Sequence, residues 1–102
     1  MRIPVNPEVC SDKLKVLSDA TRLAVVELLL AGPKLVGELQ AKIRVEQSLL
    51  SHHLSILREA KLVLAVRDGK GVRYQIAPEV ARAVSGNVLD LGCCRLSFGK
   101  GS

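Results

Sequence analysis

The sequence predicts a small, mainly α-helical domain that carries one β-hairpin. Three observations support this fold class. Apolar residues recur at helical spacing through most of the chain, glycine and proline mark several boundaries between these segments, and one later stretch alternates at strand spacing. With 102 residues, of which 48% are hydrophobic, the chain has the size of a single domain, residues 1–102, around one core.

Two helices are predicted first. Pro7 is a typical first-turn residue and opens a helix over residues 7–17. Three residues of this helix fall on one side: Cys10, Leu14 and Leu17. Ser18 is expected to cap a second helix, which extends to about residue 31 and stops at a Gly-Pro pair. The second helix is apolar on most sides, which predicts that it lies at the centre of the core.

A short third helix is predicted over residues 36–43, and a three-residue connection leads into a fourth that begins at Gln47. The spacing i, i+4, i+7 and i+11 gives the fourth helix one stripe toward the core: Leu50, Leu54, Leu57 and Lys61. Two helices joined by so short a turn indicate a helix-turn-helix motif.

The opposite face of the fourth helix is polar. After Gln47 it presents short donors and acceptors: Ser48, Ser51, His52 and Ser55. Such groups can hydrogen-bond base edges in a major groove, and a helix N-terminus can sit against phosphate. A solvated amphipathic helix gives the same pattern, so the prediction of DNA binding also depends on the segment that follows.

That segment predicts a β-hairpin. Residues 62–66 are an apolar run read at strand spacing, residues 72–76 alternate apolar with polar, and the intervening Asp-Gly-Lys-Gly is typical of a tight or bulged turn. Basic side chains lie at and beside its tip, within reach of phosphate or a minor groove: Arg67, Lys70 and Arg73. A basic hairpin directly after a polar-faced helix predicts double-stranded DNA as the partner.

Composition agrees with this partner. Lys and Arg outnumber Asp and Glu by 15 to 10, and the sequence pI is about 9.5. The aromatic residues are only Tyr74 and Phe98, which disfavours single-strand binding by base stacking.

No apolar run approaches the roughly 18 residues of a membrane span, so we expect a cytoplasmic protein without a membrane partner. Three cysteines beside an ample aliphatic core predict reduced thiols rather than a disulfide framework.

After the hairpin, Pro78 opens a predicted last helix that ends near Gly92. Its apolar stripe consists of Val80, Ala83, Val84, Val88 and Leu91. The remaining residues, 92–102, are expected to form a short, mobile tail that bears thiols.

The order of helices and hairpin is that of a winged helix-turn-helix domain. The motifs LSDATR (residues 17–22), GEL (37–39), QSLLSHHL (47–54), LREA (57–60) and GVRY (71–74) resemble those of the ArsR/SmtB family of metal-responsive repressors. The resemblance implies a homodimer formed through the first and last helices. It also implies recognition helices in successive major grooves of a partly palindromic operator, with half-sites about one helical turn apart.

Two positions depart from the family pattern. Glu46 stands where Ser or Asp commonly begins the recognition helix; its charge favours the helix dipole but disfavours nearby phosphate. Leu35 stands where a capping Ser is frequent.

The two adjacent histidines, His52 and His53, need separate roles, because they lie about 100° apart on the helix. We expect His53 to be a structural, partly buried residue and His52 to face DNA.

The inducer site is expected outside the positions that many family members use. Many family members bind metalloids through a Cys-x-Cys pair before the recognition helix, but residues 38–42 contain no thiol, and the last helix lacks the His of a zinc site. Cys10, Cys93 and Cys94 remain, and packing of the terminal helices in the dimer can bring them together. Three thiolates suit a soft ion, which predicts As(III) or Sb(III) as inducer and no permanent cofactor.

The sequence leaves other ligands of the thiols and other functions open. The same thiols could bind Cd(II), Hg(II) or Pb(II), or act as a redox or persulfide switch in which Cys10 is one disulfide partner. A thiol metal carrier would not require the basic hairpin. An enzyme is disfavoured, because no cysteine has a His and an acid nearby in the sequence.

Overall fold

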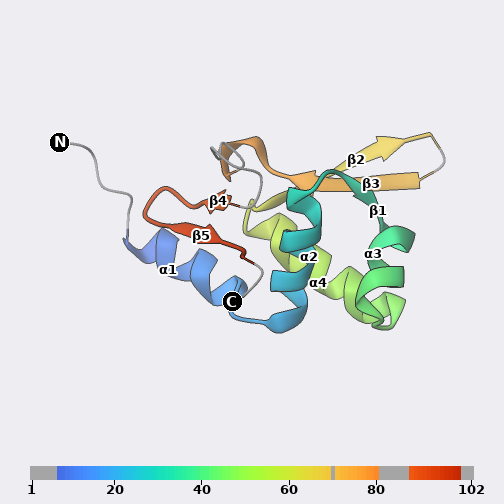
Figure 1. Cartoon of the computed structure of the whole chain (residues 1–102), viewed down its shortest axis with the longest axis horizontal. Helices are drawn as coiled ribbons and strands as arrows, with labels where there is room; N and C mark the ends of the chain where they lie inside the picture. Colours follow the sequence, from blue (N-terminus) through green and yellow to red (C-terminus); the bar gives the residue numbers. More distant parts are fainter. Residues whose placement is uncertain (1–6, 70, 81–87, 100–102) are drawn as a thin grey trace.

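The computed structural model describes residues 7–69, 71–80 and 88–99 (Figure 1). Its helices are α1 (Pro7–Val16), α2 (Ala20–Leu30), α3 (Val36–Ile43), α4 (Gln47–Glu59) and the short 3-10 helix η1 (Pro78–Val80). Its strands are β1 (Lys34–Leu35), β2 (Val63–Asp68), β3 (Gly71–Ile76), β4 (Val88–Asp90) and β5 (Arg95–Ser97). The predicted class, mainly α with a β-hairpin in a winged helix-turn-helix arrangement, is confirmed.

The core forms around α2 and α4, as their apolar stripes predict. Val25 and Val26 on α2 are fully buried, and the predicted stripe of α4 is buried at Leu50, Leu54 and Leu57. The fourth member of that stripe was predicted wrongly. The helix ends at Glu59, and Lys61 follows it in the left-handed region with φ 64°, where its side chain is exposed. A chain that reverses there cannot continue the helical stripe.

The start of α2 depends on a network that joins three helices. Asp19, rather than the expected Ser18, is the N-cap, and its Oδ1 accepts a hydrogen bond from the Arg22 backbone N–H at 3.1 Å. This hydrogen bond lowers the pKa of the Asp19 carboxyl. The Arg22 side chain donates to the Val16 carbonyl at 2.6 Å and to His53 Nδ1 at 3.0 Å. Arg22 thus holds the end of α1 and the middle of α4 to α2.

The wing is a three-stranded sheet in the order β1-β3-β2. The hairpin pairs Val63 with Ile76 and Asp68 with Gly71, and Gly69 takes φ 62° in its turn. Strand β1, which pairs with β3 and was not predicted, is only two residues long. In β2, Val63 is buried whereas Leu64 and Val66 are about two-fifths exposed, so the wing projects beyond the core after its first residue. The wing tip lies at the right-hand end of the molecule in Figure 1.

The last helix and the mobile tail were predicted wrongly where the structure describes them. A 3-10 helix replaces its first turn, and residues 81–87, which carry Ala83 and Val84, lie outside the described residues. Val88–Asp90 then pairs antiparallel with Arg95–Ser97. Leu89 and Leu91 are both buried, which is strand spacing, and Gly92 has φ 92°, which suits a tight turn between strands. Residues 92–97 of the predicted tail therefore belong to a second hairpin packed on the domain.

Among the described residues, no helix combines the length and the apolar character needed to cross a bilayer.

Candidate functional site

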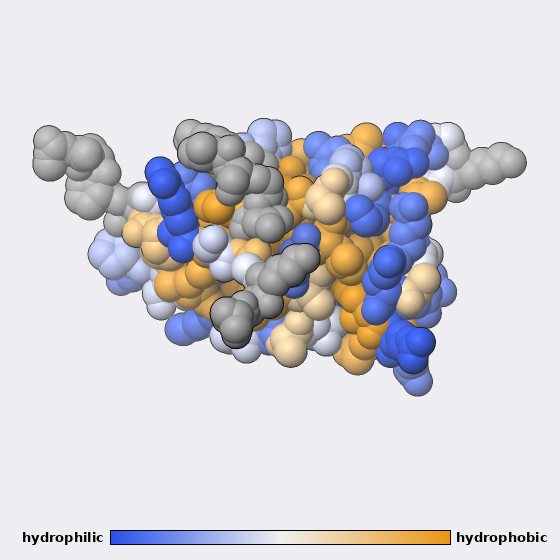
Figure 2. Space-filling view, in the orientation of Figure 1, coloured by the Kyte–Doolittle hydropathy of each residue, from blue (hydrophilic) through white to orange (hydrophobic). Residues whose placement is uncertain are grey.

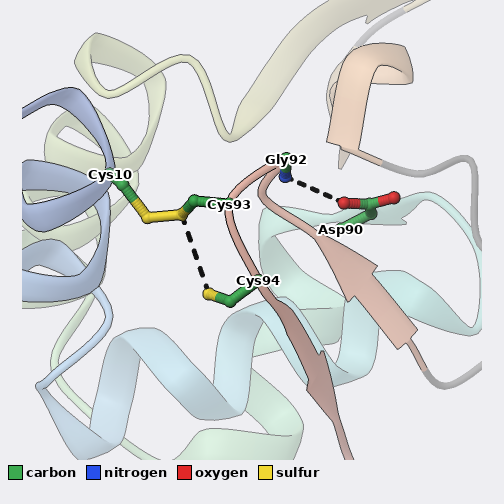
Figure 3. The surroundings of a disulfide bond; sticks show 5 residues. All are labelled: Cys10, Asp90, Gly92, Cys93 and Cys94. Atoms are coloured by element: carbon green, nitrogen blue, oxygen red, sulfur yellow. Dashed lines mark hydrogen bonds between the residues drawn. A yellow bond between two sulfur atoms is a disulfide. The ribbon is translucent and has the colours of Figure 1, made fainter. Parts of the chain in front are cut away.

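The three cysteines meet within one chain, where α1 faces the turn between β4 and β5 (Figure 3). Cys10 is on α1 and is only 8% exposed, whereas Cys93 is exposed and Cys94 is half-buried. Their three Sγ atoms lie within 4.8 Å of one another. Cys10 and Cys93 are joined by a disulfide with a Cα–Cα distance of 6.3 Å, and Cys94 Sγ lies 3.9 Å from Cys93 Sγ.

The geometry of the β4–β5 turn sets the positions of two of these thiols. The Gly92 backbone N–H donates to Asp90 Oδ1 at 2.8 Å, and the Leu91 N–H donates to the Cys94 carbonyl at 2.9 Å. The turn therefore presents Cys93 toward α1, as Figure 3 shows, while Cys94 packs against the edge of the core. Residues 83 positions apart, Cys10 and Cys93, become neighbours through this second hairpin.

Within residues 7–69, 71–80 and 88–99, the cysteines form the one group of three or more His, Cys, Asp or Glu side chains that could hold a metal ion. Neither histidine belongs to it. The rings of His52 and His53 are tilted by 56° with centroids 5.8 Å apart. Because Arg22 can only donate, His53 Nδ1 accepts its hydrogen bond, which places the proton of the neutral ring on Nε2. At 7% exposure His53 is the buried structural residue that was expected.

The outward face of α4 carries the predicted polar residues. All of them are exposed: Gln47, Ser48, Ser51, His52 and Ser55. Leu49, which was not predicted as a contact, lies beside them with 45% of its surface exposed. An exposed apolar side chain on such a face suits contact with a thymine methyl group. Glu46 is the N-cap residue of α4, with no side-chain cap hydrogen bond.

The basic residues of the wing differ in their surroundings. Arg67 is exposed on β2. Arg73 is paired across the hairpin with Asp68, whose Oδ2 lies 2.7 Å from both Nε and Nη2. Lys70, the third predicted contact, lies outside the described residues. Figure 2 shows hydrophilic side chains gathered over α3 and the wing, at the end of the molecule opposite the thiols.

Lys13 connects the helix that bears Cys10 to the end of α4. Its Nζ donates to the Ala60 carbonyl, just past the end of α4, at 2.7 Å. Lys13 lies one turn after Cys10 on α1, so the helix that bears the buried thiol also holds the end of α4. The sequence offered no signal for this contact, because it joins residues 47 positions apart.

Known proteins resemble this chain in sequence. A family profile described as "Bacterial regulatory protein, arsR family" matches residues 19–64. A probable mercury resistance operon repressor of Streptomyces lividans is 32% identical over 94% of this chain and 83% of its own length. The chain spans 58% to 64% of the next four curated relatives.

Solved structures are also similar. The reduced form of HlyU from Vibrio cholerae N16961 has 32% identity and a TM-score of 0.68, covering 71% of this chain and 76% of that one. A possible transcriptional regulator for arsenical resistance has 37% identity and a TM-score of 0.63, with 67% and 71% covered. A homodimeric winged helix-turn-helix domain from Mycobacterium bovis has 29% identity and a TM-score of 0.68, with 74% and 70% covered.

Four findings point to the same family: the dispersed motifs, the observed fold, the profile match, and the identity and coverage of the relatives. The chain therefore belongs to the arsR family of bacterial regulatory proteins.

Proposed function

We propose that the protein is a transcriptional repressor that binds operator DNA as a homodimer and releases it when As(III) or Sb(III) binds Cys10, Cys93 and Cys94. The observation that carries the metalloid part is the convergence of three sulfur atoms within 4.8 Å. Trivalent arsenic and antimony prefer three sulfur ligands in a pyramid, and the cluster offers three thiolates once the disulfide is reduced. The similarity to a possible regulator for arsenical resistance supports the same choice.

The DNA-binding part rests on α4 and the wing. Gln47, Ser48, Ser51, His52 and Ser55 are proposed to face the major groove, and Arg67, Lys70 and Arg73 to contact phosphate or the minor groove. In the free protein Asp68 neutralises Arg73, so Arg67 is the better phosphate contact of the two described residues. Relatives named as repressors and regulators favour this role over an enzyme.

Homodimer formation is proposed to use α1. Val9 and Leu14 on this helix are large apolar side chains that stay 46% and 39% exposed in the single chain. Exposed apolar surface of this kind is typical of an interface. The homodimeric structural relative supports the assembly, and sedimentation of the reduced protein with and without a Val9→Glu/Leu14→Glu double substitution tests it.

DNA binding is tested by a salt-dependent gel shift on the protein's own promoter. We expect affinity to fall steeply with salt. Arg67→Gln should weaken binding to all sequences and reduce the slope of log K against log salt by about 1. Lys42→Gln, an exposed change on α3, serves as the charge-matched comparison. Binding without sequence preference would argue for a thiol carrier instead.

A second candidate follows from the Cys10–Cys93 disulfide, namely a redox or persulfide switch in which oxidation rather than metalloid binding releases DNA. The similarity to a protein solved in a reduced form is consistent with redox sensitivity. Cys94 separates the two candidates, because it belongs to the three-sulfur group but not to the disulfide.

The deciding experiment titrates the reduced protein–operator complex with arsenite, antimonite, Cd(II), Hg(II), Pb(II) and a mild oxidant in parallel. For the metalloid sensor, Cys10→Ser, Cys93→Ser and Cys94→Ser should all lose release by arsenite. Cys94→Ser should still respond to oxidant if the disulfide pair is also a switch. Release by arsenite at the parent's concentration in Cys10→Ser and Cys93→Ser would refute the three-thiol site.

A further inference from the structure

A cavity of about 630 Å³ opens beside the thiol cluster, between α1, the residues that follow α4 and the β4–β5 turn. Cys93 and Cys94 line it together with three basic side chains, Lys13, Lys61 and Arg95. Cys10 is not among its lining residues; together with Cys93 it borders a separate cavity of about 540 Å³ on the α1 side. The disulfide is therefore reached from this cavity through its Cys93 sulfur.

The charges around the cavity favour an anionic ligand. Its two acidic residues are Glu79 and Asp90. Asp90 is already occupied, since Oδ1 accepts from the Gly92 N–H at 2.8 Å and Oδ2 lies 3.7 Å from Arg95 Nε. Lys61 is exposed on the left-handed turn after α4. With Arg95 and Asp90 paired to each other, two cations remain against Glu79: Lys61 and Lys13, which also donates to the Ala60 carbonyl. The cavity therefore suits carboxylate groups, and Glu79 offers a place for an ammonium group on the same molecule.

We propose that this cavity binds a low-molecular-weight thiol that carries carboxylates and that the bound thiol reduces the Cys10–Cys93 disulfide. The inference rests on the proposed function in one respect: three thiolates are available to As(III) only after this bond is reduced. The cavity would then determine which cellular thiol reduces the protein to the form that can bind As(III).

The reduction is an ordinary thiol–disulfide exchange. The ligand loses its thiol proton to solvent, its thiolate attacks Cys93 Sγ, and the bond to Cys10 breaks, so Cys10 leaves as a thiolate and takes up a proton. A second ligand thiolate attacks the ligand sulfur of the mixed disulfide and releases Cys93. The protein disulfide gains two electrons, and two ligand thiols become one ligand disulfide. Attack at Cys93 agrees with its exposure, because Cys10 is only 8% exposed.

The test measures the rate of Cys10–Cys93 reduction by three small thiols: 3-mercaptopropionate, 2-mercaptoethanol and cysteamine. Each rate is expressed per thiolate and divided by the rate for a small neutral disulfide. We expect the anionic thiol to be favoured at low salt, and Lys61→Gln to reduce its rate about threefold, the effect of one charge several ångströms away in water. The neutral thiol should react equally with parent and variant.

Lys42→Gln removes the same charge from an exposed position on α3 and is the matched control. If Lys42→Gln slows the anionic thiol as much as Lys61→Gln, or if the parent shows the selectivity of the small disulfide, the cavity does not bind the thiol. Mass spectrometry at limiting thiol should find the mixed disulfide on Cys93, and an adduct on Cys10 would also overturn the proposal.

The outcome is separable from that of the metalloid site. Both readouts are measured on the parent protein, one as the rate of disulfide reduction by the three thiols and the other as arsenite-induced DNA release. Selective reduction in a protein that ignores arsenite would leave the thiol cavity intact and refute only the metalloid function.

Discussion

Two adjacent histidines on α4 have opposite surroundings. His53 points inward and accepts a hydrogen bond from Arg22, which in turn holds the end of α1. His52 is exposed beside Ser51 on the face proposed to bind DNA. A rotation of about 100° per residue thus separates a structural role from a proposed DNA-binding role within one dipeptide.

Alanine substitution should separate these roles. His53→Ala should lower the free energy of unfolding by about 1.5–3 kcal/mol, because it removes a buried partner of the Arg22 guanidinium. His52→Ala should leave stability within about 0.5 kcal/mol and weaken operator binding. Urea unfolding and a gel shift on both variants check this. Equal destabilisation by the two changes would contradict the assignment.

Asp19 caps the N-terminus of α2 through its side chain. Asp19→Ala should lower stability by about 1 kcal/mol, the usual contribution of an N-cap. Because the pKa of Asp19 is lowered by folding, its ionised form stabilises the domain above the unfolded pKa of about 4, and this contribution is lost as pH falls through the folded value.

The stability curves of parent and Asp19→Ala should therefore approach each other in acid. Asp12→Ala, on the exposed face of α1, is the matched control and should show neither effect. A gap between parent and Asp19→Ala that stays constant down to pH 2 would exclude the capping carboxylate as its source.

At the scale of elements, α1 is the link between the thiols and α4. It carries Cys10 at one turn and, at the next, Lys13, whose ammonium group donates to the Ala60 carbonyl. A ligand that draws Cys10 toward the β4–β5 turn would shift α1 and, through Lys13, the end of α4. Such a ligand changes DNA affinity only if it binds the low-affinity arrangement more tightly.

Lys13→Met should weaken this link. We expect a loss of about 1 kcal/mol in stability and a smaller ratio between operator affinities without and with arsenite. Lys15→Met, an exposed position on the same helix, should leave the ratio unchanged. Fluorescence anisotropy with labelled operator measures both affinities. An unchanged ratio in Lys13→Met would show that the signal takes another route.

For the whole molecule, the second hairpin completes the core. Leu89 on β4 is fully buried in the same cluster as Leu50, Leu54 and Leu57 of α4. The hairpin thereby fixes the position of Cys93 and Cys94 against α1. Residues 88–97 therefore contribute both to the core and to the geometry of the thiol cluster.

Leu89→Ala should cost about 2–5 kcal/mol, as for other fully buried leucines. Leu64→Ala, at a leucine 40% exposed on the wing, should cost well under half as much and serves as the control. Urea unfolding of both variants tests whether residues 88–97 belong to the cooperative core. Equal costs would mean that they do not.

The predictions from sequence succeeded where one local pattern dominates. The stripe Leu50, Leu54 and Leu57, the hairpin turn at Gly69 and the inward position of His53 all follow from spacing along a single element. They failed where two periodicities competed. Val88 and Leu91 fit a helical stripe that begins at Val80, but Leu89 and Leu91 also fit strand spacing, and burial in the core favours the strand.

The sequence by itself determined the winged helix-turn-helix order, the polar face of α4 and the identity of the three thiols, because these depend on residue type and local periodicity. Only the tertiary structure decided that Cys10, Cys93 and Cys94 meet within one chain, that Lys13 reaches Ala60 and that a basic cavity borders the disulfide. Each of these joins segments far apart in the chain, and such contacts are set by how the elements pack around a shared core rather than by any local pattern.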